Sequence, residues 1–105
     1  MAKKTKIDYA RQGAESFERR KKAGAYIKKL RNKVDGLTQR EMAEKLGIDY
    51  FTFVSQVENG FARVPPAALN EWARELKVPL HEFATHLLKF YEPEMYKAIF
   101  SGPRK

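Results

Sequence analysis

The fold is decided by residues 37–60, which read LTQREMAEKLGIDYFTFVSQVENG. Thr38 and Glu41 have the spacing of a capping box, in which each side chain accepts a hydrogen bond from the other residue's backbone amide. An apolar stripe at helical spacing follows, formed by Met42, Ala43 and Leu46. Gly47 comes next, and glycine commonly ends a helix because it adopts a positive φ without strain. The pattern predicts a helix over about residues 38–46.

A second short helix is predicted after a brief turn, over about residues 50–58. Asp49 is the expected N-cap, since a short side-chain oxygen can accept a hydrogen bond from the first free amides. Val54 and Val57 have the spacing of an inward face, and residues 59–60 (Asn-Gly) close the helix. Two short helices joined by a tight turn are typical of a helix-turn-helix unit.

Apolar residues at three- and four-residue spacing predict further helices on both sides of this pair. One begins at Ala23, one follows Pro65-Pro66 and one follows Val78-Pro79. Their apolar stripes are Ala23, Tyr26, Ile27, Leu30 and Val34; Leu69, Trp72, Ala73 and Leu76; and Leu80, Phe83, Ala84, Leu87, Leu88 and Tyr91. Beyond Pro93, Met95, Tyr96, Ile99 and Phe100 predict one short additional helix. No stretch alternates with the period of two that a strand needs, so the predicted fold class is all-α.

Length and composition narrow the classes of function. A chain of 105 residues suits one domain. The absence of cysteine excludes disulfides, zinc-finger sites and thiol catalysis. We expect no metal, cofactor or small-molecule ligand, and no catalytic set of paired carboxylates or nucleophile and base is present, so an enzyme is not expected. No apolar run is long enough to span a bilayer or to form a secretory signal, which favours a cytoplasmic, nucleoid-associated protein.

The net charge of +8 favours a polyanionic partner, but it is unevenly distributed. Residues 1–22 carry +5, whereas residues 23–103 total only +1. We therefore divide the chain into a flexible basic arm (1–22), a helical domain (23–92) and a C-terminal extension (93–105). Within the arm, residues 14–22 are compatible with either a loop or an early helical turn. The arm is expected to add affinity for DNA through counterion release, the alternative being a disordered tail that aids solubility.

Residues 23–90 resemble the Cro and phage-repressor group of helix-turn-helix regulators, often called the XRE family. The ordered segments that carry the resemblance are Leu37 to Gln39, Ala43 to Ile48, Val54 to Gly60, Pro65-Pro66, the Leu69/Trp72/Ala73/Leu76 stripe and Val78 to Leu80. The resemblance implies a five-helix, lambda-repressor-like DNA-binding domain. This chain departs from the family between Gly47 and Val54, where it is one residue longer. Either the second helix starts one residue earlier or the turn bulges.

The resemblance implies that the second motif helix enters the major groove of double-stranded DNA. The implied DNA-binding residues are Gln39, Tyr50, Phe51, Thr52, Ser55, Gln56, Asn59 and Arg63. Gln56 can pair bidentately with adenine, and an exposed Tyr50 or Phe51 can pack on thymine methyl groups. Gln39 would contact a backbone phosphate and support the recognition helix, and Phe53 is expected in the core.

Further candidates for phosphate contacts are Thr38, Lys28, Lys29 and Arg40. Thr38 is foremost a helix cap, and Lys28, Lys29 and the neighbouring Arg31 have a solvated helix face as their alternative. The family usually binds as a two-fold dimer. The expected interface lies in the apolar C-terminal segment: Leu87, Phe90, Tyr91, Tyr96, Ile99 and Phe100.

These observations favour a sequence-specific DNA-binding transcriptional regulator, expected to be a repressor that recognises an inverted-repeat operator as a homodimer. Two alternatives remain open. One is the antitoxin of a toxin–antitoxin pair, which would repress its own promoter and bind a toxin through the C-terminal stripe. The other is a protein-interaction adaptor that keeps this fold without DNA binding, for which the aromatic residues 50–53 are the main support.

Overall fold

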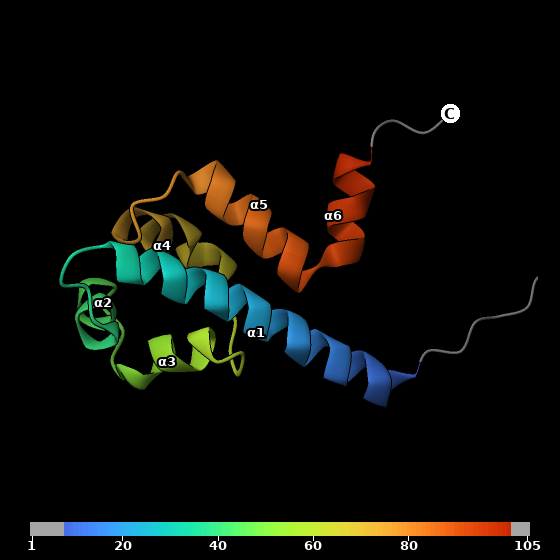
Figure 1. Ribbon diagram of the computed structural model, residues 1–105, viewed down its shortest axis with the longest axis horizontal. Helices are drawn as coiled ribbons and strands as arrows, with labels where there is room; N and C mark the ends of the chain where they lie inside the picture. The colour runs from blue at the N-terminus through green and yellow to red at the C-terminus, as the bar shows by residue number, and fades with distance from the viewer. Residues whose placement is uncertain (1–7, 102–105) are drawn as a thin grey trace, which may run out of the picture.

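The computed structural model describes residues 8–101, and within that range all regular secondary structure is helical (Figure 1). The six α-helices are α1 (Tyr9–Lys33), α2 (Gln39–Lys45), α3 (Thr52–Glu58), α4 (Leu69–Glu75), α5 (Leu80–Tyr91) and α6 (Pro93–Phe100). A single 3-10 turn, η1 (Pro66–Ala68), leads into α4. The predicted all-α fold, including the short additional C-terminal helix, is confirmed.

Helix α1 runs through the middle of the bundle, with α2 and α3 on one side and α4 and α5 on the other (Figure 1). The core between these layers is built from the apolar stripes of the helices. Its largest fully buried side chains are Trp72, Phe83, Ile27, Met42, Leu76, Val54 and Val57. The helix-turn-helix unit is therefore held against α1 by apolar packing, which is the main favourable contribution to folding.

The crossing of α1 and α3 depends on a glycine inside α1. A Cβ added to Gly24 would overlap the backbone carbonyl of Glu58 and would lie 2.6 Å from the carbonyl oxygen of Val57. Glycine weakens a helix interior, because its backbone loses more conformational freedom on folding. Here it allows the α1 backbone to contact the C-terminal end of α3 directly, and that contact fixes the position of α3.

The structure corrects the predicted flexible arm over the part of residues 1–22 that it describes. Asp8 caps α1, its side chain accepting a hydrogen bond from the Arg11 backbone amide at 3.1 Å. Farther along, the Arg20 guanidinium donates to the Gly60 carbonyl at 2.8 Å, and the Phe17 ring packs 5.4 Å from that of Phe61. Residues 9–22 therefore continue α1 by several turns. The rest of the predicted arm, residues 1–7, lies outside the described residues.

The motif helices have the predicted order, with one difference at the turn. The capping box of Thr38 and Glu41 is present, and Gly47 has a φ of 71°. The predicted N-cap at Asp49 is wrong, because α3 begins only at Thr52 and the residue before it makes no side-chain cap hydrogen bond. Helix α3 therefore does not start earlier, and residues 46–51 connect the two motif helices.

The C-terminal segment divides into a buried and an exposed part. Leu87 and Tyr91 were expected at a dimer interface, but they lie in the monomer core on the inward face of α5, at 3% and 8% exposure. The Tyr91 hydroxyl accepts a hydrogen bond from the Val64 backbone amide at 3.3 Å, which ties α5 to the segment before α4. Helix α6 packs on α5 and buries none of its residues. None of the helices within residues 8–101 is long and apolar enough to span a membrane.

Candidate nucleic-acid interface

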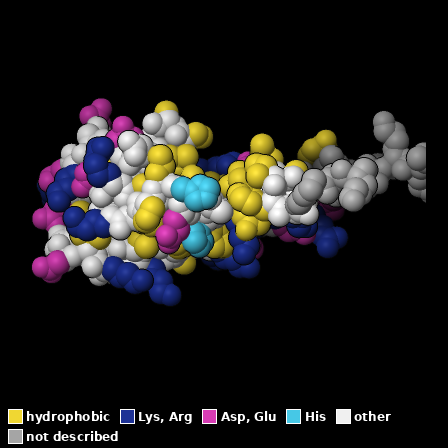
Figure 2. All heavy atoms as spheres, turned by 90° about the horizontal axis from the view of Figure 1, so that it is seen from above, with side chains coloured by type: hydrophobic (Ala, Val, Ile, Leu, Met, Phe, Trp, Pro, Cys, Tyr) yellow, Lys and Arg dark blue, Asp and Glu magenta, His cyan; other side chains and the backbone are white. Residues whose placement is uncertain are grey.

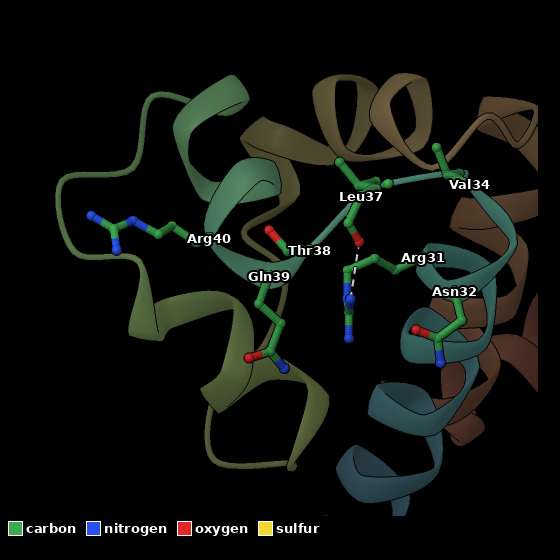
Figure 3. A pocket seen from close by; sticks show the side chains of 8 residues that line it. Arg31, Asn32, Val34, Leu37, Thr38, Gln39 and Arg40 are labelled. Atoms are coloured by element: carbon green, nitrogen blue, oxygen red, sulfur yellow. Dashed lines mark hydrogen bonds between the residues drawn. The ribbon is translucent and has the colours of Figure 1, made fainter.

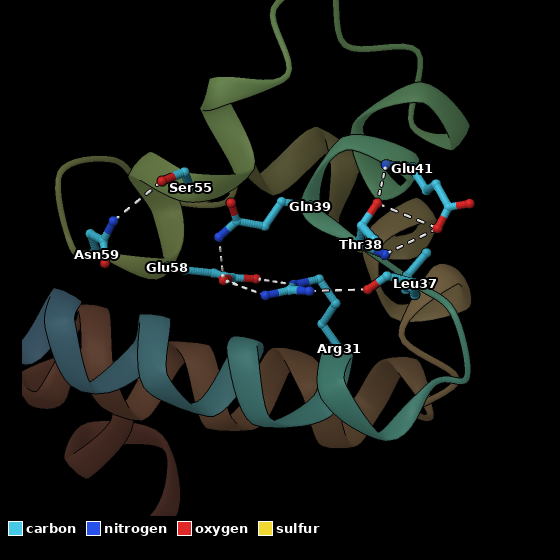
Figure 4. A network of polar contacts seen from close by, with 8 residues as sticks. All are labelled: Arg31, Leu37, Thr38, Gln39, Glu41, Ser55, Glu58 and Asn59. Atoms are coloured by element: carbon cyan, nitrogen blue, oxygen red, sulfur yellow. Dashed lines mark hydrogen bonds and ion pairs between the residues drawn. The ribbon is translucent and has the colours of Figure 1, made fainter.

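A buried ion pair connects α3 to the rest of the fold (Figure 4). Glu58, in the last turn of α3, has a side chain only 1% exposed and receives two hydrogen bonds from Arg31 of α1, at 2.7 and 3.1 Å. The third guanidinium nitrogen donates to the Leu37 carbonyl at 3.0 Å. A buried charge is costly unless it is paired and fully hydrogen-bonded, and this arrangement meets both conditions.

Gln39 completes this network at the first residue of α2. Its side-chain amide nitrogen donates to the Glu58 carboxylate at 2.8 Å, so α1, α2 and α3 all converge on one carboxylate (Figure 4). Gln39 was expected to support the recognition helix, and this contact confirms that part of the expectation. Its expected phosphate contact is not tested by the structure.

The opposite face of α3 is polar and open to solvent. Thr52, Gln56 and Asn59 are exposed, and Ser55 is half-buried beside them. We call these four residues the reading face. The Asn59 side-chain amide donates to the Ser55 hydroxyl at 3.3 Å, so these two side chains hold each other (Figure 4). Because the four residues recur at three- and four-residue spacing, they share one side of the helix.

The aromatic residues around the start of α3 separate as expected. Phe53 packs against the core with its ring edge-on to that of Trp72, at a centroid distance of 6.4 Å. Tyr50 and Phe51 remain exposed in the turn. Phe51 lies under the guanidinium of Arg40, 4.9 Å from the ring centroid, and Arg40 also pairs with Glu44 at 3.8 Å.

The candidate basic residues have different surroundings. Arg63 pairs with Glu92 at 3.1 Å and lies over the Tyr91 ring, so its charge is partly neutralised at the C-terminal end of α5. On α1, Lys28 is four residues after Gly24, which contacts α3, and it therefore points to the α3 side of the helix. Lys29, about 100° farther round, points away from α3. Of the two lysines, only Lys28 lies on the α3 side of α1.

An open, polar depression lies at the start of α2, between it and the C-terminal end of α1 (Figure 3). Thr38 and Gln39 line it from α2, and Arg31 and Asn32 line it from α1. Arg40 extends to the opposite side from Arg31 (Figure 3). Within residues 8–101, no group of three or more side chains is arranged to hold a metal ion.

Two residues central to this site were missed by sequence reasoning. Arg31 was expected on the duplex or on a solvated helix face, but it is buried, and Glu58 was given no role. A signal for Arg31 was present, because it follows Ala23 and Ile27 at four-residue spacing and so shares their inward face. No such local pattern identifies Glu58 as the partner of Arg31, because the two residues are 27 positions apart.

Comparison with known proteins agrees with this geometry. Residues 27–83, more than half of the chain, match the model of a helix-turn-helix family. The matched span runs from the last two turns of α1 into α5 and contains the whole Glu58 network and the reading face. No curated protein and no solved structure shows a significant match to the chain. The chain therefore belongs to the XRE-type helix-turn-helix family, a family of DNA-binding regulators.

Proposed function

We propose that this protein binds double-stranded DNA sequence-specifically as a homodimer, with α3 in the major groove. It acts in the cytoplasm, on the nucleoid, as a repressor at an inverted-repeat operator. The observation that carries the proposal is the Glu58 network. It fixes α3 on α1 and α2 from behind while the reading face stays open, which is the preorganisation that a recognition helix needs.

Within the reading face, Gln56 is the residue best suited to discriminate bases. Its side chain is exposed in the middle of the face, and a glutamine amide can pair bidentately with the N6 and N7 positions of adenine. Thr52, one turn earlier, can bond a base edge or a phosphate. Ser55 and Asn59 contribute through their mutual hydrogen bond, which places the Asn59 amide at the end of the helix.

Phosphate contacts are proposed at the rim of this face. Thr38 and Gln39 line the depression at the start of α2, and Lys28 lies on the α3 side of α1. Arg40 and Arg63 become available when they leave Glu44 and Glu92, pairs that are about half exposed or more. Such exposed ion pairs contribute little stability, so a phosphate can replace the carboxylate at low cost.

Self-association is proposed through α6 and the neighbouring end of α5. Of the expected interface residues, Ile99 and Phe100 are exposed, Tyr96 is half-buried, and Phe90 is half-buried and packs against the core. Ile99 and Phe100 are 59% and 49% exposed, and the Tyr96 and Phe100 rings lie tilted against each other with their centroids 4.7 Å apart. Figure 2 shows hydrophobic side chains gathered along this face toward the C-terminal end, whereas charged side chains dominate the other end.

The antitoxin hypothesis is supported by a separate observation. An apolar groove of about 620 Å³ lies between η1, α5 and the start of α6, and its lining includes Pro65, Leu69, Leu88 and Met95. A toxin bound there would use the same exposed C-terminal surface as a dimer. The two possibilities differ in whether the purified protein self-associates without a partner.

An unbiased genomic binding experiment tests the proposal. The wild-type protein should enrich a set of sites that share a sequence with two-fold symmetry, and Gln56→Ala should lose the preference at one base pair of each half-site. Gln12→Ala, the same change at an exposed position on α1, is the matched control and should retain it. If Gln39→Ala and Gln56→Ala both leave a sequence-selective footprint unchanged, α3 does not read DNA.

A further inference from the structure

Two large aromatic side chains stand exposed where the chain enters α3. Tyr50 is 55% exposed and Phe51 is 49% exposed, whereas the third aromatic of this segment, Phe53, is packed against the core. Neighbouring exposed aromatics are unfavourable in water and are a common property of contact surfaces. Both residues lie in the connection between the end of α2 at Lys45 and the start of α3 at Thr52.

These aromatics are held in fixed positions. The Tyr50 ring meets Phe53 edge-on at 5.9 Å, and Phe53 meets the buried Trp72 edge-on at 6.4 Å, so a continuous row of rings leads from the core to the surface. The Phe51 ring is covered on one face by Arg40, at 4.9 Å. A rigid apolar group loses little conformational entropy on binding, which favours its use in recognition.

Phe51 also extends the reading face. The backbone is already helical at Phe51, with φ of −69° and ψ of −13°, and the Phe53 amide donates to the Tyr50 carbonyl at 3.1 Å. Phe51 therefore lies one helical turn before Ser55, as Thr52 lies one turn before Gln56. The exposed ring is continuous with a row of hydrogen-bonding side chains on the same side of α3.

We propose that Phe51 contacts the 5-methyl group of a thymine in each half-site and so determines specificity at that base pair. This inference rests on the proposed function. Thymine is the only base whose major-groove edge carries an apolar group, and every other edge would leave polar atoms unsatisfied against the ring. Tyr50 acts as a positioning residue, because it supports the turn through Phe53.

The experiment uses the operator that the full chain selects from random DNA. Each thymine is replaced in turn by deoxyuridine, which removes only the 5-methyl group, and affinity is measured by fluorescence anisotropy. At one thymine position of each half-site, the replacement should weaken wild-type binding about fourfold. This is the factor expected from the burial of one methyl group. Phe51→Ala should bind the thymine and deoxyuridine operators equally, and Phe51→Leu should keep part of the difference.

Phe61→Ala is the matched control, since Phe61 is also an exposed phenylalanine (71%) but lies beyond the end of α3. It should keep the full fourfold difference. The inference is overturned if no thymine shows methyl dependence, or if Phe51→Ala retains it. Unchanged operator affinity in Phe51→Ala would also overturn it and would favour a protein partner for this surface. A chain that selects no DNA sequence at all refutes the proposed function itself, and this inference with it.

Discussion

Replacement of glycine by alanine should have opposite effects on stability at two positions of α1, Gly13 and Gly24. The difference arises because only Gly24 contacts α3. Gly13 also lies inside α1, but a Cβ added there meets nothing within 4 Å, whereas at Gly24 it overlaps the backbone of Glu58. Alanine is favoured over glycine in a helix interior by about 1 kcal/mol. Gly13→Ala should therefore stabilise the protein by about 0.5–1 kcal/mol.

At Gly24 the steric overlap outweighs this gain. The obstructing atoms belong to backbone and not to the end of a flexible side chain, so α3 must move away from α1. Overpacking of this kind costs about 3 kcal/mol, at the upper end of the usual range, because the Glu58 network is displaced as well. Subtracting the helix-propensity gain leaves a net loss of about 2 kcal/mol for Gly24→Ala, or a midpoint about 10 °C lower.

Urea and thermal unfolding followed by circular dichroism measure both variants against the wild type. The two alanine variants should differ by about 3 kcal/mol in the free energy of unfolding. A Gly24→Ala protein as stable as Gly13→Ala would mean that α1 and α3 do not meet backbone to backbone at this crossing.

Three other predictions use the same described contacts. Glu58→Gln should lower the free energy of unfolding by about 3 kcal/mol in chemical denaturation, because it leaves the Arg31 charge buried without a counter-charge. The double variant Arg31→Met/Glu58→Leu should recover part of that loss. A double variant less stable than Glu58→Gln would argue against the buried ion pair. Lys28→Gln should lower the slope of log affinity against log salt by about 0.9, whereas Lys29→Gln should leave it nearly unchanged; equal slopes in the two variants would contradict the placement of Lys28. Burial raises the pKa of the Tyr91 phenol, so the phenol stabilises the fold below about pH 10, and this stabilisation is lost as the pH rises further. Tyr91→Phe should lower the free energy of unfolding by about 1 kcal/mol at neutral pH, because it removes the hydrogen bond to Val64. Above pH 10, thermal unfolding should show that this variant loses less stability than the wild type.

The elements that were predicted correctly are those encoded by neighbouring residues. The capping box of Thr38 and Glu41 needs only a three-residue spacing, and Gly47 needs only its own backbone freedom, so both could be read without knowledge of tertiary structure. The start of α3 could not be predicted from neighbouring residues. The Tyr50-Phe51 turn carries no capping side chain and is held by ring contacts that reach Trp72.

The errors share a physical cause, which is that exposed helices and long-range pairs leave weak local signals. Residues 9–22 were assigned to an arm because most of that stretch of α1 is solvated and lacks an apolar period, although Phe17 and Arg20 attach it to the loop after α3. Leu87 and Tyr91 were assigned to an interface because periodicity identifies an apolar face without saying what covers it. The Arg31–Glu58 pair was missed because its two halves are 27 residues apart.

The central claim is that the reading face of α3 selects the DNA sequence. It is tested most directly by selecting binding sites from a random DNA library with the wild type and with Gln56→Ala, and comparing the base preference at each position. We expect a two-fold symmetric site in which Gln56→Ala relaxes the preference at one base pair of each half-site and leaves the other positions unchanged. An identical site for both proteins, or no enriched sequence for either, would contradict it.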